Sequence, residues 1–397
     1  MRKLIRLTLS LSLVGILIGG VAVASVPQGA SYITPAEALS LPKSGNGFTN
    51  ASWAASYLKT YPAPNLGDVN TRAGSEALTA AVFWLAGGKS DATLLSATKT
   101  FILKAPGTWP SGGQALNPMR GLGGILAAVK LLTDAGQWSS GAKLPNLGNI
   151  TWAAFISNLE TRNLGTLNSR WQTILGTAID TASNWGSVAR FSLVSIAALR
   201  GDQALFDRAV GLVQRYMGDL TKAAAFNRTA SYRASWDNYG SPAGKVNAGI
   251  GRLDGTGRDG VVIEDVARGG TDYCATCPYF GATGSGLTYP LEAAEYTWAT
   301  LAVLRHAGFD VRSWTSTALK RMNDWFQRAH SGSTTVYLYA ESAFSIYKND
   351  RWYANRLTGG TSPYGAPVPT ASGPGGYLRS QPPGDWMAAP GSTWMSG

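Results

Sequence analysis

The stretch SNWGSVARFSLVSIAALRGDQALFDRAVGLV, residues 183–213, decides the fold. Apolar residues recur in it every three or four positions, which predicts amphipathic helices at residues 185–199 and 204–220. Asn184 or Ser183 can cap the first helix, and Gly201 followed by Asp202 separates the two helices. Because the break between them is short, the two helices are expected to form an antiparallel pair.

The same helical spacing recurs along most of the chain. The further segments that show it are residues 76–85, 92–102, 120–135, 152–159, 291–307, 313–329 and 336–347. Gly136 and Gly308 mark the ends of two of these segments. The alternation of apolar and polar residues that is typical of strands is scarce. The sequence therefore predicts an all-α fold of helix pairs joined by turns, without a clear internal repeat.

The N-terminus has the layout of a secretory signal peptide. Arg2, Lys3 and Arg6 precede the apolar run LSLSLVGILIGGVAVA, which closes in small residues at Ala24. We expect cleavage after Ala24 and a secreted or periplasmic mature protein. A membrane anchor is the alternative, because the run is close to the length that spans a bilayer. No second run of that length follows in the sequence.

The charge balance points to an anionic partner. The chain holds 34 Lys and Arg against 23 Asp and Glu, a formal net charge of +11. A basic exported protein usually meets an anionic polymer or surface. The sequence has no zinc-finger spacing, no RNA-binding aromatic signature and no lysine-rich arm, which argues against nucleic acid. A polyanionic polysaccharide and an acidic cell surface remain as the expected kinds of partner.

One irregular region, residues 227–290, interrupts the helical pattern and is rich in Gly, Asp, Arg and aromatic residues. A structureless stretch of this length within a domain is uncommon unless it is functional. It contains IEDVARGGTDYCATCPYFG, residues 263–281, with Cys274 and Cys277 as the chain's only cysteines. Because export favours oxidation, we predict a local disulfide between them rather than a reactive pair.

The sequence also predicts three regions along the chain. After residue 356 it becomes rich in Gly, Pro and Ser, which indicates a tail wrapped on the body or partly disordered. The expected regions are a signal peptide at residues 1–24, a catalytic domain at residues 25–356 and a tail at residues 357–397.

The sequence lacks the motifs of several common classes of catalytic site. The only histidines, His306 and His330, lie near the ends of predicted helices, where a histidine more often ends the helix than acts as a base. The sequence has no HExxH, no P-loop, no dinucleotide fingerprint and no nucleophile elbow. Carboxylates, arginines and tyrosines remain for chemistry, so we predict no cofactor and no metal site.

Two reaction types use these groups. A glycoside hydrolase needs two carboxyl groups, for which the candidates are Asp259, Glu264, Asp265, Asp272, Glu292 and Glu295. Of these, Glu292 and Glu295 lie three residues apart on a predicted helix and are first interpreted as a solvated or capping face. A uronate lyase needs groups that neutralise the substrate carboxylate, together with a base and an acid, and Asn, Arg and Tyr can supply all of these.

Two segments resemble a known family. Residues 183–213 resemble the helix pair of the alginate lyase family, polysaccharide lyases with an α/α toroid, in which an asparagine opens one helix and an LFDxAV-like helix follows. DGVVIEDVARGGTDY, residues 259–273, resembles the family's second signature, an acidic residue, then Ala-Arg-Gly, then an aromatic residue. The resemblance implies an incomplete α/α toroid that cleaves a uronate polymer by β-elimination.

The resemblance also implies roles for three residues. Asn184 matches the asparagine that contacts the uronate carboxylate, Arg268 matches the family's arginine, and Tyr273 is the nearest counterpart of its catalytic tyrosine. Plainer interpretations remain open for each of them. Asn184 can be an N-cap, Arg268 can pair with Glu264 or Asp265, and Tyr273 can be a packed loop residue.

The sequence departs from the family pattern at two points. Trp185 stands where the family usually has a histidine, so a syn elimination in which one tyrosine moves both protons fits what is left. The tyrosine spacing also differs, and Tyr279 and Tyr289 compete with Tyr273 for the catalytic role.

We therefore expect a secreted, monomeric polysaccharide lyase. The alternatives are a glycoside hydrolase on the same scaffold and a non-catalytic polysaccharide-binding protein. The predicted substrate-binding residues are Trp185, Tyr279, Tyr289, Arg258 and Glu264.

Overall fold

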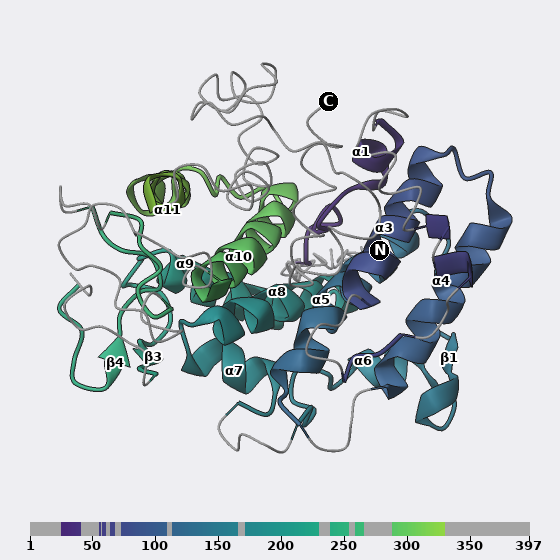
Figure 1. The fold of residues 1–397 in the computed structure, drawn as a ribbon, viewed down its shortest axis with the longest axis horizontal. Coiled ribbons are helices and arrows are strands. Elements are labelled where there is room, and N and C mark those ends of the chain that lie inside the picture. Colours follow the sequence, from purple (N-terminus) through teal and green to yellow (C-terminus); the bar gives the residue numbers. More distant parts are fainter. Residues whose placement is uncertain are drawn as a thin grey trace, which may run out of the picture.

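The structure of the chain is a computed structural model (Figure 1). It describes residues 25–40, 55–56, 58–60, 64–67, 73–108, 113–165, 171–229, 239–253, 259–265 and 288–329. These residues are mostly helical. Their strands are short antiparallel pairs, β1 (Lys143–Leu144) with β2 (Ile150–Thr151) and β3 (Phe226–Asn227) with β4 (Lys245–Val246). The predicted all-α class is confirmed.

The helices follow the predicted segments closely. They are α1 (Pro35–Ser40), α3 (Ala73–Ala86), α4 (Ala92–Lys104), α5 (Leu116–Asp134), α6 (Trp152–Ile156), α7 (Ile174–Asp180), α8 (Asn184–Arg200), α9 (Gln203–Tyr216), α10 (Thr288–His306) and α11 (Trp314–Ala329), with 3₁₀ turns η1 (Ala105–Gly107) and η2 (Pro145–Leu147). Helices α1 and α7 were not predicted, because six or seven residues hold too few turns to show a period. The predicted helix at residues 336–347 lies outside the described residues.

The turn between α8 and α9 has the predicted chemistry. Gly201 adopts a left-handed conformation with φ of 64°, which ends α8, since a residue without a Cβ takes this conformation at little cost. The Asp202 side chain then accepts a hydrogen bond from the Leu205 backbone N–H and caps α9. Two consecutive residues therefore stop one helix and start the next.

Four helices pack in a row at the centre of the molecule. Helix α3 packs against α5, α5 against α8 and α8 against α10, as Figure 1 shows. Helix α4 packs against α3, and both α7 and α9 pack against α8. Successive members of the row are separated along the chain by helices that lie outside it.

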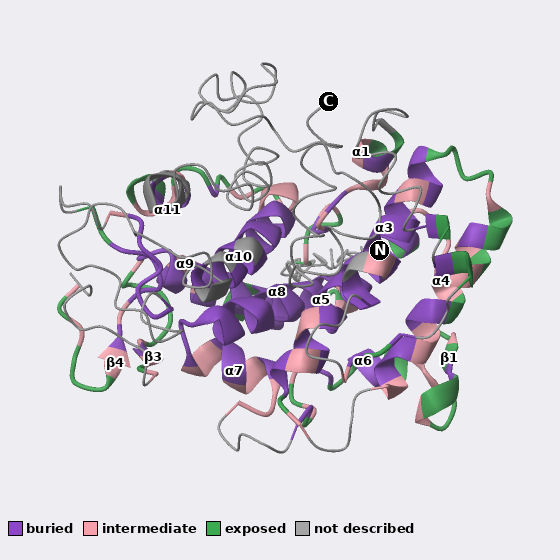
Figure 2. Cartoon of the chain, in the orientation of Figure 1, coloured by how far each residue is buried: buried purple, intermediate pink, exposed green. Residues whose placement is uncertain are grey.

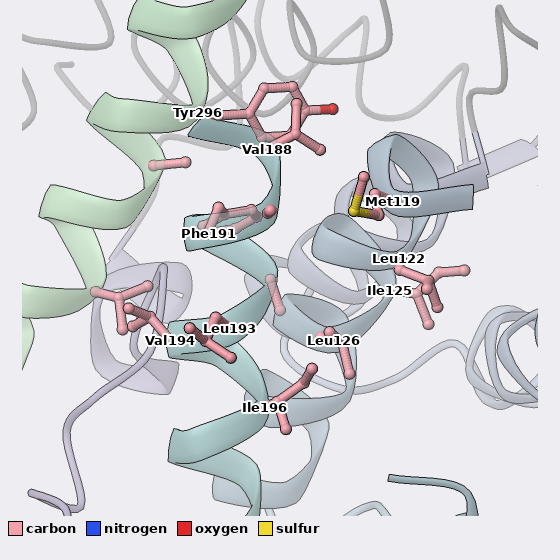
Figure 3. Packing of buried hydrophobic residues seen from close by; sticks show 14 of the residues in the cluster. Met119, Leu122, Ile125, Leu126, Val188, Phe191, Leu193, Val194, Ile196 and Tyr296 are labelled. Carbon is pink, nitrogen blue, oxygen red and sulfur yellow. The ribbon is translucent and has the colours of Figure 1, made fainter. Parts of the chain in front are cut away.

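Helices α5, α8 and α10 run in the same direction. Their contacts advance together along each axis, from Asn184 with Glu292 to Phe191 with Tyr296, whose ring centroids are 6.1 Å apart. Figure 3 shows the same order for α5 and α8, with Met119 beside Val188 at one end and Leu126 beside Ile196 at the other. The first turns of the three helices therefore lie at one end of the row.

Helix α8 is the most enclosed element. Its residues are buried without a break from Asn184 to Ala198 (Figure 2). Close approach of its neighbours depends on glycine, because a Cβ on Gly123 would lie 2.6 Å from the Phe191 ring. Likewise, a Cβ on Gly124 would lie 2.5 Å from the backbone of Gly74 in α3. Glycines in α5 thus set the spacing of the row.

The N-terminal segment packs across the far ends of α5 and α10. Lys130 of α5 donates to the Gln28 carbonyl oxygen over 3.1 Å. His306, the last residue of α10, lies with Nδ1 2.6 Å from the Ser31 carbonyl oxygen and Nε2 2.9 Å from Glu37 Oε1. His306 therefore ends its helix as predicted and ties α1 to it.

Other predicted features cannot be placed on this fold. The predicted signal peptide, the tail at residues 357–397 and His330 lie outside the described residues. Within the described ranges, no helix combines the length and the apolar character needed to cross a membrane.

Candidate active site

Three polar side chains from three helices meet where α5, α8 and α10 begin. Arg120 donates from Nε to Glu292 Oε1 over 2.5 Å and from Nη2 to Glu292 Oε2 over 2.9 Å. Asn184 donates from Nδ2 to Glu292 Oε2 over 2.5 Å. Tyr296 donates its hydroxyl to the Arg120 carbonyl oxygen over 3.1 Å. One carboxylate thus joins the starts of three helices.

The Arg120–Glu292 pair is largely removed from water. The Glu292 side chain is 2% exposed and the Arg120 side chain 11% exposed, and Asn184 is fully buried. A two-point arginine–carboxylate pair has a fixed geometry and is stronger than a single charged hydrogen bond. Arg120 is consequently the only one of the three side chains with appreciable access to solvent.

This geometry corrects two interpretations of the sequence. Glu292 was interpreted as part of a solvated or capping face, and that interpretation is wrong, because its side chain is buried against Arg120 of α5 and Asn184 of α8. The N-cap of α8 is Ser183, whose side chain makes no capping bond, and Asn184 is the first helical residue. The Asn184 amide reaches Glu292 instead of capping its own helix.

A second polar cluster lies under the same end of α8. Glu264 accepts a hydrogen bond from Thr181 Oγ1 over 2.9 Å and another from the Thr229 backbone N–H over 2.5 Å. Both Glu264 and Asp265 are fully buried. Burial raises the pKa of Glu264, against the opposing effect of the bonds from Thr229 and Thr181. Glu264, predicted to bind substrate, therefore holds its segment against α8 rather than lining a surface.

Arg190 supplies the positive charge of this cluster. Its guanidinium is 2% exposed, donates to the Thr181 carbonyl oxygen over 2.9 Å and lies 4.3 Å from the centroid of the Tyr216 ring. Burial lowers the pKa of Arg190 to about 10, although Tyr216, Glu264 and Asp265 act in the opposite direction. Burial also raises the pKa of Tyr216 to about 12. The cluster thus balances two buried acids with one buried cation.

Trp185 does not face the surface. It is 5% exposed, and its ring centroid lies 5.2 Å from that of Trp171 at an interplanar angle of 52°. Trp171, which is not among the predicted binding residues, is half-buried and packs on Trp185. Of these two tryptophans, Trp171 is therefore the one that keeps solvent-exposed surface.

The remaining predicted site residues are not placed. Tyr289 is the second residue of α10, at the same end as Glu292, but its side chain is not described. The other residues, which lie outside the described ranges, are Arg258, Arg268, Tyr273, Tyr279, Cys274 and Cys277. The disulfide and the roles of the arginines and tyrosines stay predictions.

Sequence reasoning missed Arg120 altogether and misplaced Glu292. A signal for both exists in the sequence, because each is a charged residue within a mostly apolar helical run, NPMRGLGGIL and PLEAAEYTWATL. A charge at such a position needs a buried partner of opposite sign. Nothing in the local pattern, however, shows which of the chain's charges is that partner.

No group of three or more His, Cys, Asp or Glu side chains suited to a metal ion occurs among the described residues. The chain matches no protein-family model, and searches of curated proteins and of solved structures find no match either.

Proposed function

We propose that the protein is a secreted polysaccharide lyase with an incomplete α/α toroid, which cleaves a uronate-containing polymer such as alginate by β-elimination. The row of α3, α5, α8 and α10 supports the toroid, because helices that lie outside the row connect its successive members. The net charge of +11 supports an anionic substrate.

One observation carries the proposal: Thr181 Oγ1 donates to Glu264 Oε2 over 2.9 Å. Thr181 comes three residues before Asn184, and Glu264 comes four residues before Arg268. Four residues of chain span at most about 14 Å. The second signature segment therefore meets the chain just before the first one, at the start of α8.

The reaction requires one base and one acid. The base removes the proton at C5 of the uronate, the C4–O4 bond breaks, a double bond forms between C4 and C5, and the leaving O4 takes up a proton. Negative charge develops next to the substrate carboxylate as C5 loses its proton, so positive charge and N–H donors must neutralise that carboxylate. We assign the proton transfers to Tyr273, with Arg268 as the cation beside it.

The geometry refines the role of Asn184. Since Asn184 is fully buried and donates to Glu292, it positions this end of the site rather than presenting its amide to solvent. Arg120 shares the same carboxylate and is 11% exposed. We therefore assign the contact with the substrate carboxylate to Arg120 as well as to Arg268, and we assign Asn184 and Glu292 to holding Arg120 in place.

A time course of absorbance at 235 nm tests the proposal. The chain from residue 25 to residue 397 is mixed with a panel of uronate polymers, because elimination creates an absorbing C4–C5 double bond and hydrolysis does not. We expect a rise on at least one polymer. Arg268→Ala and Arg120→Ala should abolish the rise, whereas Arg312→Ala, at an arginine 49% exposed, should leave it unchanged.

If the absorbance at 235 nm does not rise on any polymer, the lyase proposal is wrong, and a glycoside hydrolase is the second candidate function. A glycoside hydrolase uses a carboxylic acid whose pKa is raised so that it can protonate the leaving oxygen. New reducing ends without absorbance at 235 nm would identify that activity.

A further inference from the structure

A tryptophan and a lysine from distant segments are joined by a chain of hydrogen bonds beside the start of α8. Trp171 donates its indole N–H to Asp180 Oδ2, and Asn227 donates from Nδ2 to Asp180 Oδ1. Lys245 donates from Nζ to Asn227 Oδ1 over 2.5 Å. Trp171, Asp180, Asn227 and Lys245 are all half-buried, so each keeps some solvent-exposed surface.

The backbone fixes each of these side chains. Asn227 and Lys245 face each other in the register of β3 and β4, and Asn227 also forms a bridge with Thr181. Asp180 is the last residue of α7, and the Trp171 ring packs on the buried Trp185 at 5.2 Å. An aromatic face and an ammonium group are thus held in one arrangement before any ligand binds, which lowers the entropic cost of binding.

These four hydrogen-bonded side chains lie next to the candidate active site. Trp185, on which Trp171 packs, follows Asn184 directly in α8. Thr181 bridges to Asn227 through its backbone and donates to Glu264 through its side chain. Trp171 and Asn227 are therefore each one contact away from residues at the start of α8.

We propose that Trp171, Asn227 and Lys245 form a subsite for one uronate residue of the polysaccharide chain, next to the site of cleavage. The inference rests on the proposed function, whose substrate it places. The indole takes the apolar face of the pyranose ring, the Lys245 ammonium pairs with the uronate carboxylate, and Asp180 with Asn227 bonds the ring hydroxyls. The exposed Arg228, next to Asn227 in the chain, extends the positive side of the subsite.

Binding of a short uronate oligosaccharide tests the subsite without any need for turnover. The dissociation constant is measured by isothermal titration calorimetry for the unchanged protein, for Trp171→Ala and for Lys245→Gln. A neutral glucan oligosaccharide of the same length is the control ligand. We expect each substitution to weaken uronate binding about tenfold, which corresponds to about 1.4 kcal/mol. The neutral oligosaccharide should bind the unchanged protein at least tenfold more weakly than the uronate.

The chain supplies matched controls in another hairpin. Trp138 is also a half-buried tryptophan on a buried one, with its ring centroid 5.3 Å from that of Trp152. Lys143 is an exposed lysine of β1, in the other two-stranded sheet. Trp138→Ala and Lys143→Gln should leave uronate binding within twofold. If Trp171→Ala does not fold, Trp171→Leu, which keeps apolar bulk without the flat face, replaces it.

The outcomes separate the subsite from the lyase. One outcome is that uronate binding depends on Trp171 and Lys245 while no absorbance develops at 235 nm. This outcome would support the subsite and contradict the lyase activity. Elimination with binding unchanged in both variants would support the lyase and overturn the subsite. Equal losses in the Trp138 and Lys143 controls, or no uronate binding at all, would also overturn it.

Discussion

The amide of Asn184 donates a hydrogen bond to the carboxylate of Glu292, 108 positions away in the sequence. The same carboxylate accepts two bonds from Arg120, so the starts of α5, α8 and α10 meet at a single side chain. Because these helices form most of the central row, this contact bears on stability as well as on the proposed activity.

Glu292→Ala should lower the free energy of unfolding by about 3–5 kcal/mol, the usual cost of removing one partner of a buried ion pair. It leaves the Arg120 guanidinium without its carboxylate and Asn184 without its acceptor. Urea unfolding followed by tryptophan fluorescence measures the change. Arg120→Met/Glu292→Gln, which removes both charges and keeps an acceptor for Asn184, should lose much less.

The control for this pair is an exposed one. Lys59 and Asp91 form an ion pair with side chains 33% and 39% exposed. Lys59→Ala should cost less than about 1 kcal/mol. A similar cost for Glu292→Ala and Lys59→Ala would show that the buried contact does not stabilise the fold as described.

Glu37 should make the protein sensitive to acid. Burial acts to raise the pKa of Glu37, but the hydrogen bond and charge of His306, with Thr34 and Arg305, outweigh it and lower the pKa from 4.5 to about 2. A carboxyl with a lowered pKa stabilises the fold above its unfolded value and loses that contribution as pH falls through the folded value. Because the Glu37 side chain is 28% exposed, solvent screening limits this stabilisation to about 1–2 kcal/mol.

Urea unfolding at pH 5, 3.5 and 2.5 checks this prediction. The free energy of unfolding should fall over this range, and by less in Glu37→Gln. Asp310→Asn, at a side chain 63% exposed, is the control, and its free energy of unfolding should decrease over this pH range as much as that of the unchanged protein. Parallel curves for the protein and Glu37→Gln would contradict the stabilising role of the Glu37–His306 contact.

Arg190→Met should produce a pH dependence of the opposite sign. Its removal takes a buried cation away from Glu264 and Asp265 and so raises the pKa of Glu264 further. A carboxyl whose folded pKa exceeds its unfolded value destabilises the fold as pH rises. The loss of stability in Arg190→Met should therefore be larger at pH 8 than at pH 4.

Arg190→Lys separates charge from geometry. It keeps a cation but cannot reproduce the bonds to the Thr181 carbonyl oxygen and to Ser187. Its loss of stability should be nearly the same at both pH values. If Arg190→Met showed the same flat profile, the cation would not be compensating the two acids.

Two glycine-to-alanine changes in helices should act in opposite directions. Gly124→Ala places a Cβ 2.5 Å from the backbone of Gly74, so α3 and α5 must move apart, at a cost of about 1–3 kcal/mol. Gly211→Ala in α9 meets no atom within 4 Å and should raise the midpoint of thermal unfolding, since alanine favours the helix by about 0.5–1 kcal/mol. Circular dichroism on heating measures both changes, and a lower midpoint for Gly211→Ala would count against the packing described here.

The sequence predicted the helices because their signals are local. The apolar period of each helix depends only on residues a few positions apart. Gly201 and Asp202 are neighbours, so these two residue types were enough to predict the break between α8 and α9. The hydrogen bond between Thr181 and Glu264, 83 positions apart in the sequence, had no such local signal and was not predicted.

The sequence could not separate buried from exposed members of one residue type. Trp171 and Trp185 are both tryptophans near Asn184, and only the enclosure of α8 on all sides buries Trp185. Glu292 likewise has the chemistry of a surface glutamate until Arg120 and Asn184 lie beside it. Whether such a residue is buried depends on contacts between distant segments of the chain. The periodicity of a single helix carries no information about those contacts.

The common direction of α5, α8 and α10 has an electrostatic consequence. Each helix carries a macrodipole equivalent to about half a positive charge at its N-terminus, and here three such ends lie together. The resulting field draws anions toward this end from beyond contact distance. The peptide backbone itself therefore supplies attraction for a polyanion, and substitution of surface lysines would leave that part of the field in place.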